Sequence, residues 1–118
     1  MRYLCLIYVE EKKLEGMSRE EAEIQFNECL ANSRRLKNSR NYIAADPLEP
    51  VETATTIRVR GGKMTMTDGP FAETKEQLAG YYLIEAGSRE EALRIASQMP
   101  QTKYGSVEVR PVKKFDID

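Results

Sequence analysis

The chain has 118 residues and a mass of 13.5 kDa, which predicts one domain over residues 1–118 with a core that needs no disulfide or metal. Its 18 basic and 19 acidic side chains leave a net charge of −1, which gives no reason to expect direct binding to nucleic acid or to an anionic membrane. The absence of histidine excludes Ser–His–Asp and Cys–His catalysis and histidine-based zinc sites.

The first predicted element is a strand over residues 2–10 with apolar side chains at both odd and even positions, typical of a strand covered on both faces. Its apolar run is shorter than the ~18 residues of a membrane span and has no cleavage site, so we expect a cytoplasmic protein without a membrane segment or signal peptide. Cys5 here and Cys29 further on match no metal or redox spacing and are predicted to be small core residues.

Two helices are predicted from a repeated motif, Ser-Arg-Glu-Glu-Ala, which begins at Ser18 and again at Ser88. In each copy the serine and the glutamate three residues later form a capping box, which marks a helix start. The first helix is expected to run to about Lys37, and Pro100 closes the second. Apolar or small side chains follow at helical spacing: Ala22, Phe26, Cys29, Leu30, Ser33 and Leu36 in the first helix, and Ala92, Ile95, Ala96 and Met99 in the second.

The other predicted strands cover residues 42–48, 55–60, 63–67, 78–86 and 106–112. The second and third of these form a hairpin, because Gly61 and Gly62 tolerate the positive φ angles of a two-residue primed turn. Arg58 and Arg60 lie on the polar side of that hairpin, where a solvated surface is favoured over a phosphate site.

Strand–helix–strand occurs twice, with the hairpin between, which predicts an α+β fold of the ferredoxin-like (βαββαβ-type) class with two helices on one face of an antiparallel sheet. Those helices leave the other face bare, although residues 2–10 and 78–86 are apolar on both faces. Soluble monomers rarely expose such a patch. We therefore expect a two-fold homodimer in which a second copy covers the bare face, sheet on sheet.

Asp68 is the first candidate site residue, because the following Gly69 and Pro70 fix the direction in which a strand end presents it. Two interpretations stay open: its carboxylate bonds the backbone of its own turn, or it contacts a ligand. In the loop that follows, Lys75 is a plausible neighbour of a bound anion, and Phe71 is expected to anchor the loop in the core.

Glu108 and Arg110 form a second candidate group on the last strand. If the alternating valines face the helices, this charged pair faces the bare side, with Tyr8 and Tyr82 on the same face. It is then either an edge-exposed ion pair or one wall of a cleft between subunits. The candidate ligand-binding residues are Asp68, Lys75, Tyr82, Glu108 and Arg110; no catalytic residue, cofactor or metal is predicted.

Residues 67–86, which read Thr-Asp-Gly-Pro-Phe-Ala-Glu-Thr-Lys-Glu-Gln-Leu-Ala-Gly-Tyr-Tyr-Leu-Ile-Glu-Ala, resemble the signature of the DGPF branch of the YCII-related family, and residues 107–111 resemble its closing strand. The resemblance implies a dimeric α+β barrel and, through sigma factors encoded beside such proteins, a link to transcription control. Better-known members are proposed enzymes with a histidine in the first helix and an aspartate after the second. Both residues are missing here, so that pair is not carried over.

Two functions remain open from the sequence. The favoured one is a non-catalytic homodimer that binds a small molecule or acts as a regulatory module, since the sequence has no histidine and no group of residues typical of nucleophilic catalysis. The alternative is a small enzyme that uses the carboxylate of Asp68 as a general base in a pocket between the sheets.

Overall fold

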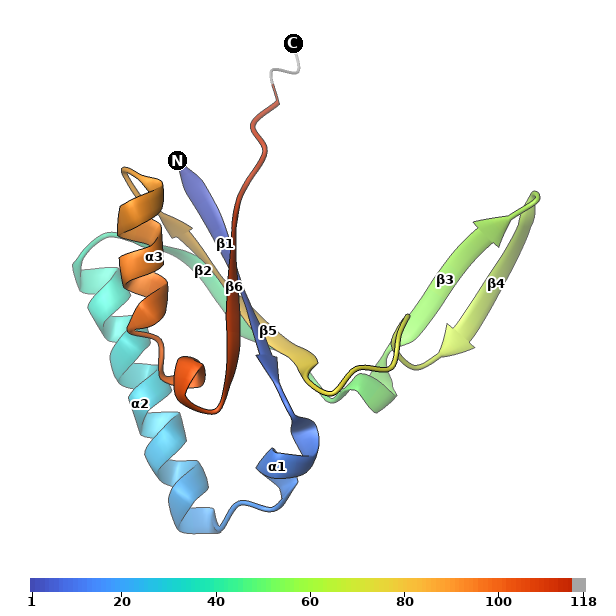
Figure 1. Cartoon of the computed structure of the whole chain (residues 1–118), viewed down its shortest axis with the longest axis horizontal. Helices are drawn as coiled ribbons and strands as arrows, with labels where there is room; N and C mark the ends of the chain where they lie inside the picture. Colours follow the sequence, from blue (N-terminus) through green and yellow to red (C-terminus); the bar gives the residue numbers. More distant parts are fainter. Residues whose placement is uncertain (116–118) are drawn as a thin grey trace.

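The computed structural model describes residues 1–115 and contains two packed helices, a main sheet and a separate hairpin (Figure 1). The elements in chain order are β1 (Arg2–Val9), α1 (Glu11–Glu15), α2 (Arg19–Asn38), β2 (Tyr42–Pro47), β3 (Thr55–Arg60), β4 (Lys63–Asp68), β5 (Gln77–Glu85), α3 (Arg89–Ser97) and β6 (Gly105–Pro111), with 3₁₀ turns at Val51–Thr53 and Pro100–Lys103. The short helix α1 and both 3₁₀ turns were not predicted.

The main sheet has the strand order β2-β5-β1-β6, and every neighbouring pair is antiparallel. Helices α2 and α3 lie on one face of this sheet, which leaves the other face without cover (Figure 1). This arrangement confirms the predicted ferredoxin-like α+β fold. None of the helices within residues 1–115 has the length and apolar character needed to cross a membrane.

Alternation along β1 decides which side chains form the core. The odd positions Tyr3, Cys5, Ile7 and Val9 are buried against the helices. The even positions from Leu4 onward are half-buried on the other side. We call this other side the open face. Its apolar residues are Leu4, Leu6, Tyr8, Leu78, Tyr81 and Leu83.

The predicted apolar stripe of α2 is only half correct. Leu36 is buried, but Phe26 is 63% exposed and Leu30 is 39% exposed. With 20 residues the helix is about 30 Å long, so its first half extends beyond the sheet that its second half covers. The stripe of α3 is correct, because its four predicted residues are all buried.

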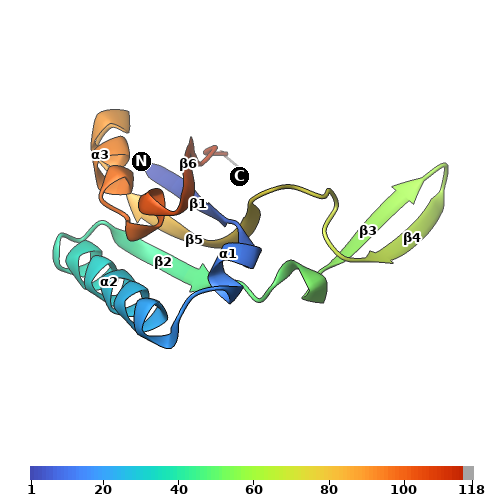
Figure 2. The same cartoon turned by 60° about the horizontal axis from the view of Figure 1, so that its bottom comes forward.

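The hairpin of β3 and β4, residues 55–68, projects from the body, and we call it the arm (Figures 1 and 2). Gly61 and Gly62 take φ angles of 57° and 77°, which confirms the predicted turn. The radius of gyration is 16.5 Å, whereas a compact domain of 118 residues has about 13.5 Å. The arm therefore lies outside the core that α2, α3 and the main sheet share.

The base of the arm is held by Glu11, the first residue of α1. Its carboxylate accepts a hydrogen bond of 3.0 Å from the Val51 N–H, on the segment that leads into the arm. Its own N–H donates to Oε1 of Gln77 at 2.9 Å, where the chain returns from the arm. One residue of α1 thus ties together both connections of the arm.

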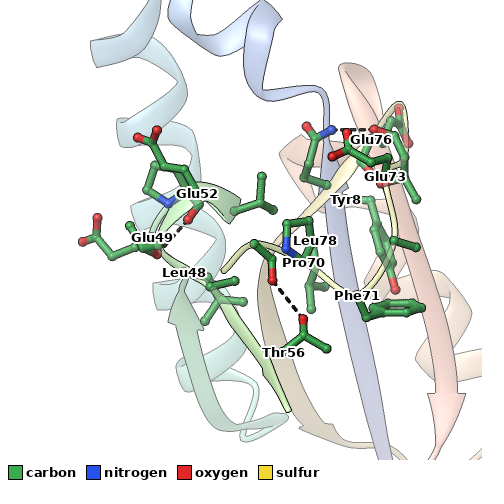
Figure 3. Close-up of a pocket in the computed structure, with 18 of the residues that line it drawn as sticks. Tyr8, Leu48, Glu49, Glu52, Thr56, Pro70, Phe71, Glu73, Glu76 and Leu78 are labelled. Carbon is green, nitrogen blue, oxygen red and sulfur yellow. Dashed lines mark hydrogen bonds between the residues drawn. The ribbon is translucent and has the colours of Figure 1, made fainter. Parts of the chain in front are cut away.

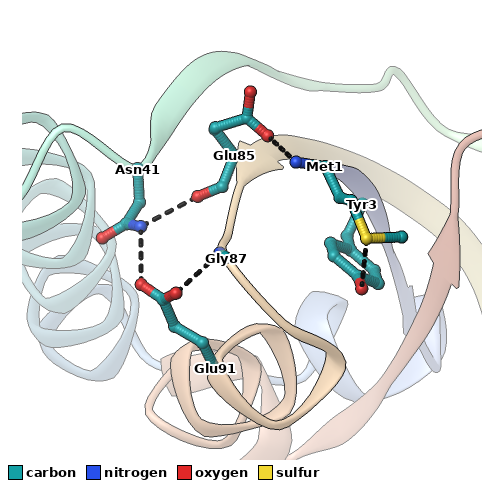
Figure 4. A network of polar contacts seen from close by, with 6 residues as sticks. All are labelled: Met1, Tyr3, Asn41, Glu85, Gly87 and Glu91. Atoms are coloured by element: carbon teal, nitrogen blue, oxygen red, sulfur yellow. Dashed lines mark hydrogen bonds and ion pairs between the residues drawn. The ribbon is translucent and has the colours of Figure 1, made fainter.

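The start of α3 is fixed by a polar network around Glu91 (Figure 4). The Ser88 hydroxyl accepts the Glu91 N–H at 3.1 Å, while the Glu91 carboxylate accepts the Gly87 N–H at 2.7 Å and the Asn41 amide at 3.3 Å. The predicted capping box is therefore shifted by one residue, since the carboxylate bonds Gly87 instead of Ser88.

Glu91→Gln is expected to destabilise the protein more at pH 7 than at pH 3. The Gly87 N–H and the Asn41 amide lower the pKa of Glu91 from its ordinary value of 4.5. The carboxylate therefore stabilises the fold above that value, and the contribution is lost as the pH falls through the lowered pKa. Thermal unfolding from pH 3 to 7 measures this, with the exposed Glu90→Gln in the same helical turn as control. An equal difference at pH 7 and at pH 3 would contradict the assignment.

Candidate functional site

A cleft of about 1520 Å³ lies between the base of the arm and the adjoining end of the main sheet (Figure 3). The body contributes Tyr8 from β1 and residues 106–108 from β6. The base of the arm and its connections contribute residues 48–57, 68–74 and 76–78. These segments are far apart in the sequence and meet only because the arm leaves the body at this point.

The cleft is strongly acidic. Among residues 1–115, its lining contains six carboxylates and not one lysine or arginine. The six are Glu49, Glu52, Asp68, Glu73, Glu76 and Glu108. Between them lie apolar side chains, of which Tyr8, Leu48 and Phe71 are seen in Figure 3. A negatively charged surface repels anions and attracts cations. The cleft therefore favours a neutral or positively charged molecule with an apolar part.

Asp68 ends β4, opposite Thr55 in the hairpin register. The turn after it is closed without its side chain, because the Gly69 N–H donates to the Ala54 carbonyl at 2.7 Å and the Thr56 hydroxyl donates to the Gly69 carbonyl at 2.8 Å. Gly69 has a φ of 104°, in the region that favours glycine. Within residues 1–115 no hydrogen bond engages the Asp68 carboxylate, so this side chain is available to a ligand.

The loop on the far side of the cleft is tied to the body by Glu76. Its carboxylate accepts a hydrogen bond of 2.7 Å from the hydroxyl of Ser106, which lies on β6. The Gln77 side-chain amide donates to the Thr74 carbonyl at 2.7 Å and stiffens the same loop. These contacts fix the distance between the loop and the sheet, and hence the width of the cleft.

The structure brings two of the five predicted site residues into the cleft, Asp68 and Glu108. Arg110 lies outside the lining and pairs with Glu108 on β6, where both side chains are substantially exposed. Of the two alternatives that the sequence left open for Glu108 and Arg110, the single chain shows the edge-exposed ion pair. Lys75 is exposed and also lies outside the lining.

Tyr82 does not share a face with Glu108, and this expectation was wrong. It stands opposite Cys5 in the register of β1 and β5, so both point toward the helices, and its hydroxyl shares a hydrogen bond of 3.1 Å with Ser33. Tyr8 does lie on the open face, next to β6, as expected.

Phe71 does not anchor its loop in the core, which corrects another expectation. Its side chain is 78% exposed and lines the cleft. The reason is the projection of the arm, which carries the loop away from the layer between sheet and helices.

Sequence reasoning missed Glu49 and Glu52 of the acidic lining. Glu49 and Glu52 precede the arm and Glu73 and Glu76 follow it, so four of the six carboxylates belong to its two connections. The available signal was the contrast between these acidic connections and a hairpin whose tip carries only positive charge.

The thiols give no activated nucleophile. Burial raises the pKa of Cys5 to about 11 and raises the pKa of Cys29 as well, so both stay protonated near neutral pH. Cys5 lies in the core, as predicted, whereas Cys29 is only half-buried. Among the described residues, no group of three or more acidic, cysteine or histidine side chains is close enough to hold a metal ion.

Comparison with known proteins gives a family and a fold. The family model for the YCII-related domain matches residues 1–116. The "Uncharacterized protein R00369" of Rhizobium meliloti (strain 1021) is 39% identical over 117 residues, which are 98% of this chain and 94% of that protein. The structure of 5-chloro-2-hydroxyhydroquinone dehydrochlorinase (TftG) from Burkholderia phenoliruptrix AC1100, in complex with 2,5-dihydroxybenzoquinone, aligns with a TM-score of 0.56 and 17% identity over 96% of this chain and 94% of that one. At this identity the likeness shows a shared fold alone.

Proposed function

The chain belongs to the YCII-related family, and on this basis we propose that it is a homodimer that binds a small molecule in the cleft beside Asp68. The observation that carries this proposal is the cleft itself, in which the Asp68 carboxylate is engaged by no other described residue. The proposed role is binding, without a catalysed reaction.

Surface area supports the homodimer. The accessible surface of the chain is 8943 Å², whereas a compact monomer of 13.5 kDa exposes about 6500 Å². The excess of about 2400 Å² is comparable with what one subunit contributes to an obligate dimer interface. The open face, with its half-buried leucines and tyrosines, supplies a continuous apolar region for such an interface.

The charge of the cleft defines the ligand class. We propose a neutral or cationic molecule with an aromatic or other apolar part and hydrogen-bond donors that carboxylates accept. The apolar part would contact Phe71 and Leu48, and the donors would bond Asp68 and its acidic neighbours. Anionic ligands are disfavoured, because each brought into the cleft meets six negative charges without a compensating cation in its lining.

The alternative is an enzyme in which Asp68 acts as a general base. It is favoured by the unengaged carboxylate and by one protein of the same fold, the dehydrochlorinase TftG. We rank it second, because the chain has no histidine and the described lining of the cleft holds no lysine that would act with Asp68 in proton transfer. Membership of the DGPF branch, a link to a sigma factor and a cytoplasmic location remain proposals from the sequence.

Three phenols that differ in charge test the binding proposal: tyramine, p-cresol and 4-hydroxybenzoate. We expect tyramine and p-cresol to raise the thermal unfolding temperature and 4-hydroxybenzoate to leave it unchanged. A ligand at ten times its Kd stabilises by about 1.4 kcal/mol, which corresponds to about 5 °C in a domain of this size.

Asp68→Asn is expected to reduce the tyramine shift at least threefold, because it removes the charge that the ammonium group would contact. The control is Glu23→Gln on the exposed side of α2, which removes the same charge far from the cleft and should leave the shift intact. The proposal fails if no phenol shifts the unfolding temperature, or if the benzoate binds as well as tyramine.

A further inference from the structure

One face of the arm is apolar and unprotected. In the hairpin register Ile57 lies opposite Met66 and Val59 lies opposite Met64, which places all four side chains on the same face. Each of them is between 57% and 62% exposed. Contiguous apolar faces of this kind mark contact surfaces in soluble proteins. Within the described chain, the arm strands pair only with each other, so no other strand covers this face.

The other face of the arm is basic. Arg58, Arg60 and Lys63 gather toward its tip, whereas the sole acidic residue of the arm, Asp68, lies at its base. Among residues 1–115 neither arginine has a carboxylate partner: Arg58 donates to the Phe71 carbonyl at 3.3 Å and Arg60 to the Val59 carbonyl at 3.1 Å. The basic face thus holds three positive charges that no described side chain neutralises.

The cleft at the base of the same arm has the complementary charge and cannot receive its own tip. Thr55, Ile57 and Asp68 line the cleft, so it begins where the arm begins. The arm then runs away from it for six residues per strand, about 20 Å (Figure 2). If one basic tip reaches the acidic cleft of a second copy related by a two-fold axis, the symmetry creates the reciprocal contact as well.

The volume of the cleft agrees with this occupant. Sites for single small molecules enclose about 300–1,000 Å³, whereas this cleft has about 1520 Å³ and is open. Space therefore remains for part of another chain as well as for a ligand. The exposed Leu48 and Phe71 offer apolar contacts, and they lie among the carboxylates that would meet the basic face.

We propose that the arm of one copy docks in the cleft of a second copy of this chain, so that the ligand site is built from two chains. The partner's Arg58, Arg60 and Lys63 pair with cleft carboxylates, and on the opposite face of the arm the partner's Val59 and Met64 contact its apolar wall. Three cations facing six carboxylates leave the site acidic, which agrees with the ligand class proposed above. This inference rests on the homodimer of the proposed function and adds where the two chains exchange contacts.

Two charge-reversed variants and their mixture test the docking. One carries Arg58→Glu and Arg60→Glu on the arm, and the other carries Glu49→Lys and Glu52→Lys in the cleft. Each alone is expected to raise the dimer Kd at least tenfold, measured by analytical ultracentrifugation, because like charges then meet. The mixture should dimerise as tightly as the wild type, since the reversed arm meets the reversed cleft in one contact and both are native in the other.

Matched controls separate folding and ligand binding from docking. Glu20→Lys with Glu23→Lys makes the same change of charge as the cleft variant, but on α2, and should leave the dimer unchanged. Circular dichroism verifies that every variant is folded. Docking is refuted if either charge-reversed variant dimerises like the wild type, or if the mixture is no tighter than its components. If such variants also retain the tyramine shift, the proposed function stands and only the arm contact fails. If tyramine does not shift the unfolding temperature of a wild type that dimerises, the proposed ligand site fails and the arm contact stands.

Discussion

Gly105→Ala is expected to destabilise the protein more than any other single methyl group added to it. Gly105 begins β6 and lies against β1, where an added Cβ would stand 2.2 Å from the Tyr8 carbonyl oxygen and 2.9 Å from Cγ1 of Val9. Neither atom can rotate away without moving a strand, because the oxygen is backbone and the valine is a buried core residue. We expect a loss of at least about 3 kcal/mol from a total stability of about 5–15 kcal/mol.

Urea unfolding followed by circular dichroism measures this loss, and Gly16→Ala is the matched control. At Gly16, after α1, the nearest atoms to an added Cβ are 3.7 Å away, and its φ of −81° suits alanine. This control should unfold at the same urea concentration as the wild type or at a higher one. A Gly105→Ala protein as stable as its control would contradict the pairing of β6 with β1.

Ile84→Ala is expected to have the second largest effect, a loss of about 2–5 kcal/mol. Ile84 is completely buried on β5, between Tyr3 of β1 and Tyr42 of β2 in the sheet register. Truncation removes its apolar contacts and leaves a cavity that a sheet with strands on both sides cannot close. Equilibrium unfolding in urea gives the change.

Ile24→Ala removes the same atoms from a side chain that is 57% exposed on α2, and it should change the stability by less than about 0.5 kcal/mol. Comparable losses for the two isoleucines would mean that the first half of α2 is covered in solution, contrary to its position in the isolated chain.

The local signals in the sequence were sufficient for the fold. Ser18 and Ser88 do begin the two packed helices, each accepting an N–H from three residues later at 3.1 Å, and the strand–helix–strand units assemble as predicted. What the sequence left ambiguous is which parity of β5 faces the helices, because its side chains are apolar on both. Tyr82 turned inward, and Tyr81 faces the open side, where its hydroxyl donates to Asp46 at 2.7 Å. A shift of one residue in register exchanges these two roles.

The candidate site was predictable only in part, because the cleft arises from the angle between arm and body. Asp68 and Glu108 were chosen for reasons local to their strands, and both line the cleft. Glu49 and Glu52 carried no such local signal. Phe71 was misjudged because an aromatic residue in a short loop commonly reaches the core, and nothing in the sequence shows that its loop leads away from it.

The double attachment through Glu11 has a mechanical consequence. Both connections of the arm meet at this residue, since its carboxylate holds Val51 and its N–H holds Gln77. A rigid hairpin fastened at one spot behaves as a lever, and Glu11 is its pivot. A displacement at that pivot is magnified along the arm, whose strands are about 20 Å long, so a ligand bound beside Asp68 would also displace the tip.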